Sequence, residues 1–69
     1  MKEYVQRMHI ELAELKERID KLDKFLKTNP IVNTLSAEQR TLMSVQLQAM
    51  KTYHKVLNRR IEIEEEQND

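Results

Sequence analysis

The sequence predicts an all-α protein, an antiparallel two-helix hairpin that assembles into a helical-bundle homo-oligomer. Three observations lead to this fold class. The 69 residues include no Gly and one Pro, and 35% are charged, a composition typical of helices. Apolar residues recur at helical spacing on both sides of the single Pro. A chain of this length without cysteine rarely stabilises itself from one small core, which favours self-association.

The first helix is expected over residues 2–28. Its apolar residues alternate between spacings of three and four, the pattern of a helix that packs along one seam. Tyr4 and Phe25 lie beside this seam, near its two ends. The seam residues are Val5, Met8, Leu12, Leu15, Ile19, Leu22 and Leu26. Acid-before-base pairs four residues apart support the exposed face by about 0.2–0.5 kcal/mol each; they are Glu3–Arg7, Glu14–Arg18, Glu17–Lys21, Asp20–Lys24 and Asp23–Lys27.

A turn is expected over residues 29–35. Pro30 disfavours the α conformation of Asn29, so the first helix should end before this pair. The turn contains apolar Ile31, Val32 and Leu35, which predicts that it packs against the helices rather than extending into solvent.

The second helix is expected over residues 36–61. Ser36 and Gln39 fit the capping box that begins a helix. Residues 1–61 would form the hairpin. The acidic residues 62–69 are expected to be a frayed tail, because acids at a helix C-terminus oppose its dipole.

Two apolar stripes run along the second helix. A helix with a single partner needs only one, so the second stripe indicates contact with another subunit. The first stripe contains Met43, Leu47, Met50, His54, Leu57 and Ile61. The second stripe contains Leu42, Val45, Ala49, Tyr53 and Val56.

No catalytic constellation is recognisable in the sequence. His9 and His54 lack the spacing of a metal-binding pair, and no Cys is present. Without Gly, a glycine-rich nucleotide loop cannot form. The longest apolar runs are two residues, too short to span a membrane. We therefore expect no enzyme activity, no cofactor, no metal and no membrane partner.

Residues 40–60 contain five basic residues and no acid. They could bind an anionic ligand, with Tyr53 and His54 available to stack on a base. Alternatively, they could pair with acids of another subunit, and His54 could be a partly buried stripe residue. Double-stranded nucleic acid is disfavoured because the chain has zero net charge. The basic residues are Arg40, Lys51, Lys55, Arg59 and Arg60, of which Lys51, Lys55 and Arg59 recur every four positions.

Several short runs resemble a known group of phage proteins. They are Leu22-Asp23-Lys24-Phe25-Leu26, a Pro-containing turn, Leu42-Met43, Leu47-Gln48-Ala49-Met50 and Asn58-Arg59-Arg60-Ile61, within about residues 4–61. This pattern resembles small proteins of tailed phages. More distantly, it is similar to the helical-hairpin domain of anti-CBASS and anti-Thoeris sponges, which sequester bacterial immune messengers.

The resemblance implies a compact helical homo-oligomer, often a hexamer, in the cytoplasm of the infected bacterial host. Such a protein binds a small anionic nucleotide, a cyclic oligonucleotide or cyclic ADP-ribose derivative, between subunits without cleaving it. A basic residue late in the family's second helix matches Arg59 or Arg60, which would contact phosphate. From the residues themselves, we expect Lys55, one turn earlier, to assist and Tyr53 or Tyr4 to cover a base or ribose face.

The sequence departs from the family at Thr52-Tyr53-His54-Lys55, where the family has aromatic and alanine residues. The identity of the messenger therefore stays open. The alternative function is a helical protein-interaction module, an adaptor or inhibitor that docks on a host protein. The uninterrupted seam and the second stripe favour that interpretation.

Overall fold

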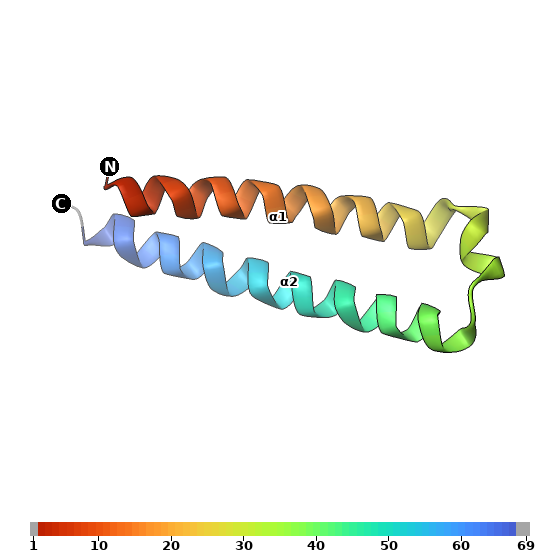
Figure 1. The fold of residues 1–69 in the computed structure, drawn as a ribbon. Helices are drawn as coiled ribbons and strands as arrows, with labels where there is room; N and C mark the ends of the chain where they lie inside the picture. Colours follow the sequence, from red (N-terminus) through yellow and green to blue (C-terminus); the bar gives the residue numbers. More distant parts are fainter. Residues whose placement is uncertain (1, 68–69) are drawn as a thin grey trace.

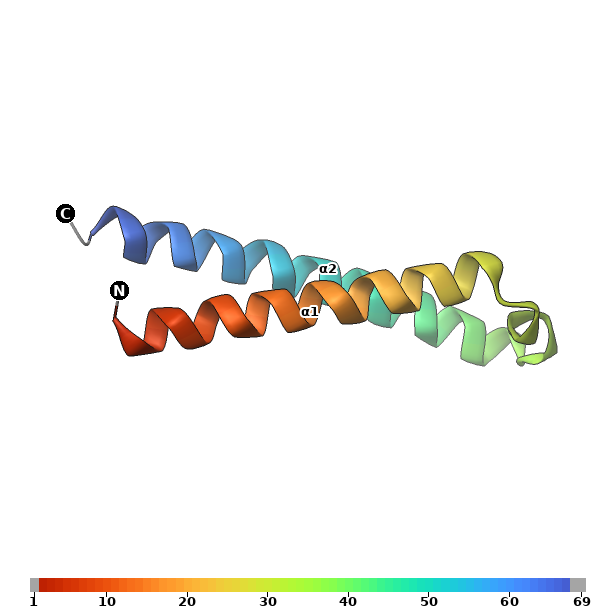
Figure 2. The ribbon, with the colours of Figure 1, turned by 90° about the horizontal axis from the view of Figure 1, so that it is seen from above.

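The computed structural model describes residues 2–67, which form one antiparallel helical hairpin (Figure 1). Helix α1 spans Glu3–Thr28 and helix α2 spans Ala37–Glu66. A short 3-10 helix, η1, spans Pro30–Thr34 between them. The hairpin measures 52 × 15 × 14 Å, and the start of α1 and the end of α2 both lie at the end opposite η1 (Figures 1 and 2). The all-helical hairpin predicted from the sequence is confirmed, whereas its assembly into an oligomer stays a prediction.

Helix α1 ends where the proline was expected to end it. Asn29 is extended, with φ −87° and ψ 121°, as the residue before a proline prefers. Its backbone N–H still donates to the carbonyl of Phe25, and its side-chain oxygen accepts a 2.9 Å hydrogen bond from the N–H of Ile31. Asn29 therefore closes α1 and begins η1.

Ser36 caps the N-terminus of α2, as the sequence predicts. Its Oγ accepts a 3.0 Å hydrogen bond from the backbone N–H of Gln39, which satisfies one of the donors that a helix start leaves unpaired. Glu38 in the first turn complements the positive end of the helix dipole.

We predict that Ser36→Ala lowers the free energy of unfolding by about 1 kcal/mol, because the cap hydrogen bond is lost. In a chain of this size, a loss of that magnitude lowers Tm by roughly 4–8 °C. Thermal unfolding followed by circular dichroism measures the change. Ser44→Ala, at an exposed position inside the same helix, is the matched control. Equal melting temperatures for the two variants would show that the cap contributes nothing.

The core lies along the line where α1 and α2 face each other. Leu15 and Ile19 of α1 pack with Leu47 of α2, and Leu22, Leu26 and Met50 cover this cluster in part. The other buried core residues are Val5, Leu57 and Ile61. Each of these residues belongs to the predicted seam of the first helix or the first stripe of the second. The helical spacing therefore identified the packed faces correctly.

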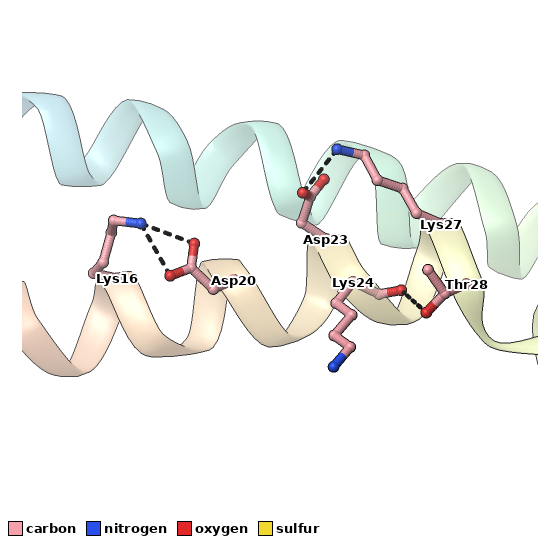
Figure 3. Close-up of polar contacts among 6 residues, drawn as sticks. All are labelled: Lys16, Asp20, Asp23, Lys24, Lys27 and Thr28. Atoms are coloured by element: carbon pink, nitrogen blue, oxygen red, sulfur yellow. Dashed lines mark hydrogen bonds and ion pairs between the residues drawn. The ribbon is translucent and has the colours of Figure 1, made fainter.

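Ion pairs line the exposed side of α1. Three of the predicted pairs form, Glu3–Arg7, Glu17–Lys21 and Asp23–Lys27. Asp20 instead accepts two 2.9 Å hydrogen bonds from Lys16 (Figure 3). Lys16 thus takes the place of Lys24 as the partner of Asp20. Among residues 2–67, Glu14 and Arg18 form no ion pair with each other.

The end of α2 differs from the prediction. We expected the helix to end at about residue 61 and residues 62–69 to fray, but α2 continues to Glu66. The acidic side chains find partners that offset their unfavourable position at the negative end of the dipole. Glu62 and Glu66 contact Arg59 on the same helix, and Glu64 contacts Tyr4 of α1. Residues 68 and 69 of the expected tail lie outside the described residues.

Candidate ligand-binding surface

The basic line predicted on the second helix turns around α2 rather than following one face. A spacing of four residues drifts by about 40° per step, because a helix has 3.6 residues per turn. All three side chains are exposed, but Lys51 lines a cleft between the helices, whereas Lys55 and Arg59 lie outside that cleft. We call Lys55 and Arg59, one turn apart on α2, the cationic flank.

The cleft beside Lys51 has a volume of about 290 Å³ and mixes both signs of charge. His54 is half-buried in the wall of this cleft. This agrees with the alternative that His54 is a partly buried residue of the first stripe. A hydrogen bond from Lys27, assisted by the positive charges of Lys27 and Lys51, lowers the pKa of Asp23. The residues lining the cleft are Lys16, Ile19, Asp20, Asp23, Lys51 and His54.

Arg59 pairs with the acidic end of its own helix. Its Nη1 lies 3.4 Å from Oε1 of Glu62 and 3.2 Å from Oε1 of Glu66. Hydrogen bonding to Glu66, then the charge of Glu66 and the bond to Glu62, raise the pKa of Arg59. The guanidinium therefore already has carboxylate partners within one chain.

Arg60 and Tyr53 lie on a different side of α2 from Arg59. Consecutive residues of a helix point about 100° apart, and Arg60 follows Val56 by four positions, which places it on the second stripe. The large residues of that stripe are open to solvent, with 46% of Tyr53 and 60% of Val45 exposed. Helix α1 therefore leaves this stripe uncovered, and its predicted contact with another subunit stays a prediction.

Tyr4 lies at the open end of the hairpin. Its hydroxyl donates a 2.5 Å hydrogen bond to Oε2 of Glu64, and this bond is the main cause that raises the pKa of Tyr4. One turn further along α1, Nε2 of His9 lies 3.3 Å from Oε2 of Glu65. These two contacts join the start of α1 to the end of α2.

A single hairpin therefore does not gather all the predicted ligand residues into one pocket. Lys55 and Arg59 lie together, Arg60 and Tyr53 lie on the second stripe, and Tyr4 contacts the acidic end of α2. His54 lies in the mixed cleft.

A larger apolar groove lies where α1 approaches the first half of α2. It has a volume of about 500 Å³, with the cations Arg18 and Lys21 at its edge. The sequence predicts an ion pair of Arg18 with Glu14, so the place of Arg18 at the edge of this groove is not expected from the sequence. Phe25 lies seven residues after Arg18 and therefore on the same side of α1. Its position beside the seam is the sequence feature that could have indicated this groove. The lining residues are Arg18, Lys21, Leu22, Phe25, Met43, Gln46 and Met50.

Within residues 2–67, the histidines and acids form no group of three or more that could hold a metal ion. The helices found in the described part of the chain are also too polar to pass through a lipid bilayer. What the hairpin offers a partner is exposed cations and exposed apolar side chains. These features describe a small helical hairpin that leaves charged and apolar side chains on its surface.

The Sequestin family model matches residues 2–63, and the chain belongs to the Sequestin family. This membership confirms the resemblance to small sponge-like phage proteins, and the family name denotes sequestration. Searches among curated proteins and among solved structures found no match.

Proposed function

We propose that the protein is a phage immune-evasion sponge, a homo-oligomer in the cytoplasm of the infected bacterium. It binds a cyclic nucleotide-type immune messenger, a cyclic oligonucleotide or a cyclic ADP-ribose derivative, and holds it without cleaving it. The observation that carries the proposal is the solvent-exposed cationic flank, Lys55 and Arg59, on a member of the Sequestin family.

The cationic flank suits phosphate groups for chemical reasons. The guanidinium of Arg59 offers a planar fork that matches two phosphate oxygens, and Lys55 adds a point charge about 6 Å along the helix. The pairs of Arg59 with Glu62 and Glu66 are exposed, and such pairs contribute only about 0–1 kcal/mol. A charge-assisted hydrogen bond to phosphate contributes about 1.5–3 kcal/mol, so a phosphate can displace these carboxylates.

A messenger-sized ligand needs more protein around it than one hairpin provides. The hairpin is 14–15 Å across its two short dimensions, so the flank lies on an open surface. The solvent-accessible area of the whole hairpin is 5380 Å², whereas a compact monomer of 8.3 kDa would expose about 4,600 Å². The extra area leaves surface on which another copy of the chain can complete the site, where Tyr4 from a neighbour can reach the ligand.

Thermal-shift measurement against cyclic dinucleotides, cyclic trinucleotides and cyclic ADP-ribose isomers tests the proposal. A messenger at 100 times its dissociation constant should add about 2.7 kcal/mol to the free energy of unfolding. Linear nucleotides of the same composition are the matched controls. Chromatography of ligand released by heating should recover it intact. If no cyclic messenger stabilises the protein, or if the messenger returns cleaved, the sponge assignment is wrong.

The exposed second stripe supports the alternative function, an interaction module that docks on a host protein. The two functions differ in what they require. A sponge binds a purified messenger with no other protein present, whereas a docking module shows no stabilisation by any nucleotide.

A further inference from the structure

The second stripe is symmetric in sequence about Ala49. Apolar residues lie four and seven positions from Ala49 in both directions along the chain, and a charged residue lies eleven positions away in both directions. The two charges have opposite signs. Toward the N-terminus the order is Val45, Leu42 and Glu38, and toward the C-terminus it is Tyr53, Val56 and Arg60. We call these seven residues the palindromic surface.

All of the palindromic surface is exposed in the hairpin. The accessible fractions of Leu42 and Val56 are 54% and 53%, so α1 covers neither half. Within residues 2–67, Glu38 and Arg60 have no ion-pair partner. The surface thus combines uncovered apolar side chains with one acid and one base, each without an opposite charge bound to it in the described chain.

We propose that the palindromic surface binds the same surface of a second copy, with the two α2 helices antiparallel about a two-fold axis through Ala49. In this register, Val45 of one copy faces Tyr53 of the other, and Leu42 faces Val56. At both ends, Glu38 of one copy meets Arg60 of the other. A two-fold contact requires a surface complementary to itself, and the symmetry about Ala49 meets that requirement.

The end charges select the antiparallel orientation. If the two α2 helices ran parallel in register, Glu38 would lie against Glu38 and Arg60 against Arg60, and like charges repel. Reversing one helix turns both contacts into opposite-charge pairs. Ala49, the smallest residue of the surface, then lies on the axis, where the two backbones approach most closely.

The spacing also keeps the surface straight. Eleven residues separate Glu38 from Ala49 and Ala49 from Arg60, and an eleven-residue repeat corresponds to about 3.67 residues per turn. This value is close to the 3.6 of an undistorted helix, so the surface follows one side of α2 for roughly 33 Å.

The symmetry favours a second copy over an unrelated protein as the occupant. Another protein could bind an apolar stripe with any arrangement of charges, and nothing would require the two halves to match. The inference does not rest on the messenger, because association is measured without a ligand. It assigns Arg60 to the contact between copies, while Arg59, on another side of the helix, remains in the cationic flank.

Charge reversal tests the register. Arg60→Glu and Glu38→Arg should each raise the dimer dissociation constant at least about tenfold, since each places like charges together twice in the dimer. The combined variant restores both opposite-charge pairs in reversed order. Its dimer dissociation constant should lie within about threefold of that of the original protein. Sedimentation equilibrium without ligand gives the constants. Lys24→Glu, at an exposed site on α1, makes the same charge change as Arg60→Glu and should have no effect.

Cysteine crosslinking gives a second readout, because the chain contains no Cys. Oxidised Ala49→Cys should form a covalent dimer, while Ser44→Cys, exposed elsewhere on α2, should not. Leu42→Cys should crosslink with Val56→Cys in a mixture but not with itself, which separates antiparallel from parallel pairing. Four results would each overturn the proposal. The wild type could stay monomeric, or the single charge variants could associate as tightly as the wild type. The combined variant could fail to recover its association, or Leu42→Cys could crosslink with itself.

Discussion

Replacing Leu47 with aspartate should unfold the hairpin. Leu47 is 6% exposed and packs directly against Leu15 and Ile19. Truncating a buried leucine alone costs about 2–5 kcal/mol, and an unpaired carboxylate in the same place adds several more. A chain of this size has a total stability of only about 3–10 kcal/mol. Circular dichroism at 25 °C should therefore show loss of most of the helical signal.

Gln48→Asp provides the control for this experiment. It introduces the same side chain at the next position of α2, where the residue is exposed, and should retain a cooperative melt. If Leu47→Asp unfolded at the same temperature as Gln48→Asp, the packing of α1 against α2 described above would be wrong.

The double variant Lys55→Ala with Arg59→Ala should lose binding of the cyclic messenger. Each cation is expected to contribute a charge-assisted contact of about 1.5–3 kcal/mol, so each loss weakens affinity roughly tenfold to a hundredfold. Removing both should weaken binding by a factor on the order of 10²–10⁴. Both side chains are exposed, so the helical content should be unchanged. Isothermal titration with the messenger found by thermal shift measures the affinity.

Arg40→Ala with Lys24→Ala removes the same amount of charge at exposed positions outside the cationic flank. This control should bind nearly as tightly as the original protein, because screened, distant charges contribute little. A folded Lys55 and Arg59 double variant with unchanged affinity would show that the messenger binds elsewhere. The groove beside Arg18 and Phe25 would then be the next candidate.

Arg60→Ala separates two roles for that side chain. If Arg60 acts through contact between copies, its loss should weaken messenger binding at low protein concentration and leave it intact where the protein is fully associated. If Arg60 contacts phosphate directly, the loss should persist at every protein concentration. Titration at two protein concentrations distinguishes the two cases.

The local features of the hairpin could be read from the sequence alone. Pro30 constrains the backbone of the residue before it, and Ser36 supplies an oxygen to the N–H three residues later, so both helix boundaries in the turn depend on near neighbours. The helical spacing of apolar residues likewise identified Leu15, Leu47 and Ile61 as core positions. The cationic residues of α2 were equally visible as a run without acids.

The tertiary structure decided everything that depends on how α1 and α2 align. The contacts from Tyr4 to Glu64 and from His9 to Glu65 join residues at opposite ends of the chain, and the helix continues to Glu66 where a frayed tail was expected. The same alignment places Lys51 in the lining of the cleft and Lys55 outside it, although both are exposed and belong to one four-residue repeat. Spacing within one helix determines which residues share a side, whereas only the packing of the second helix determines which side is covered.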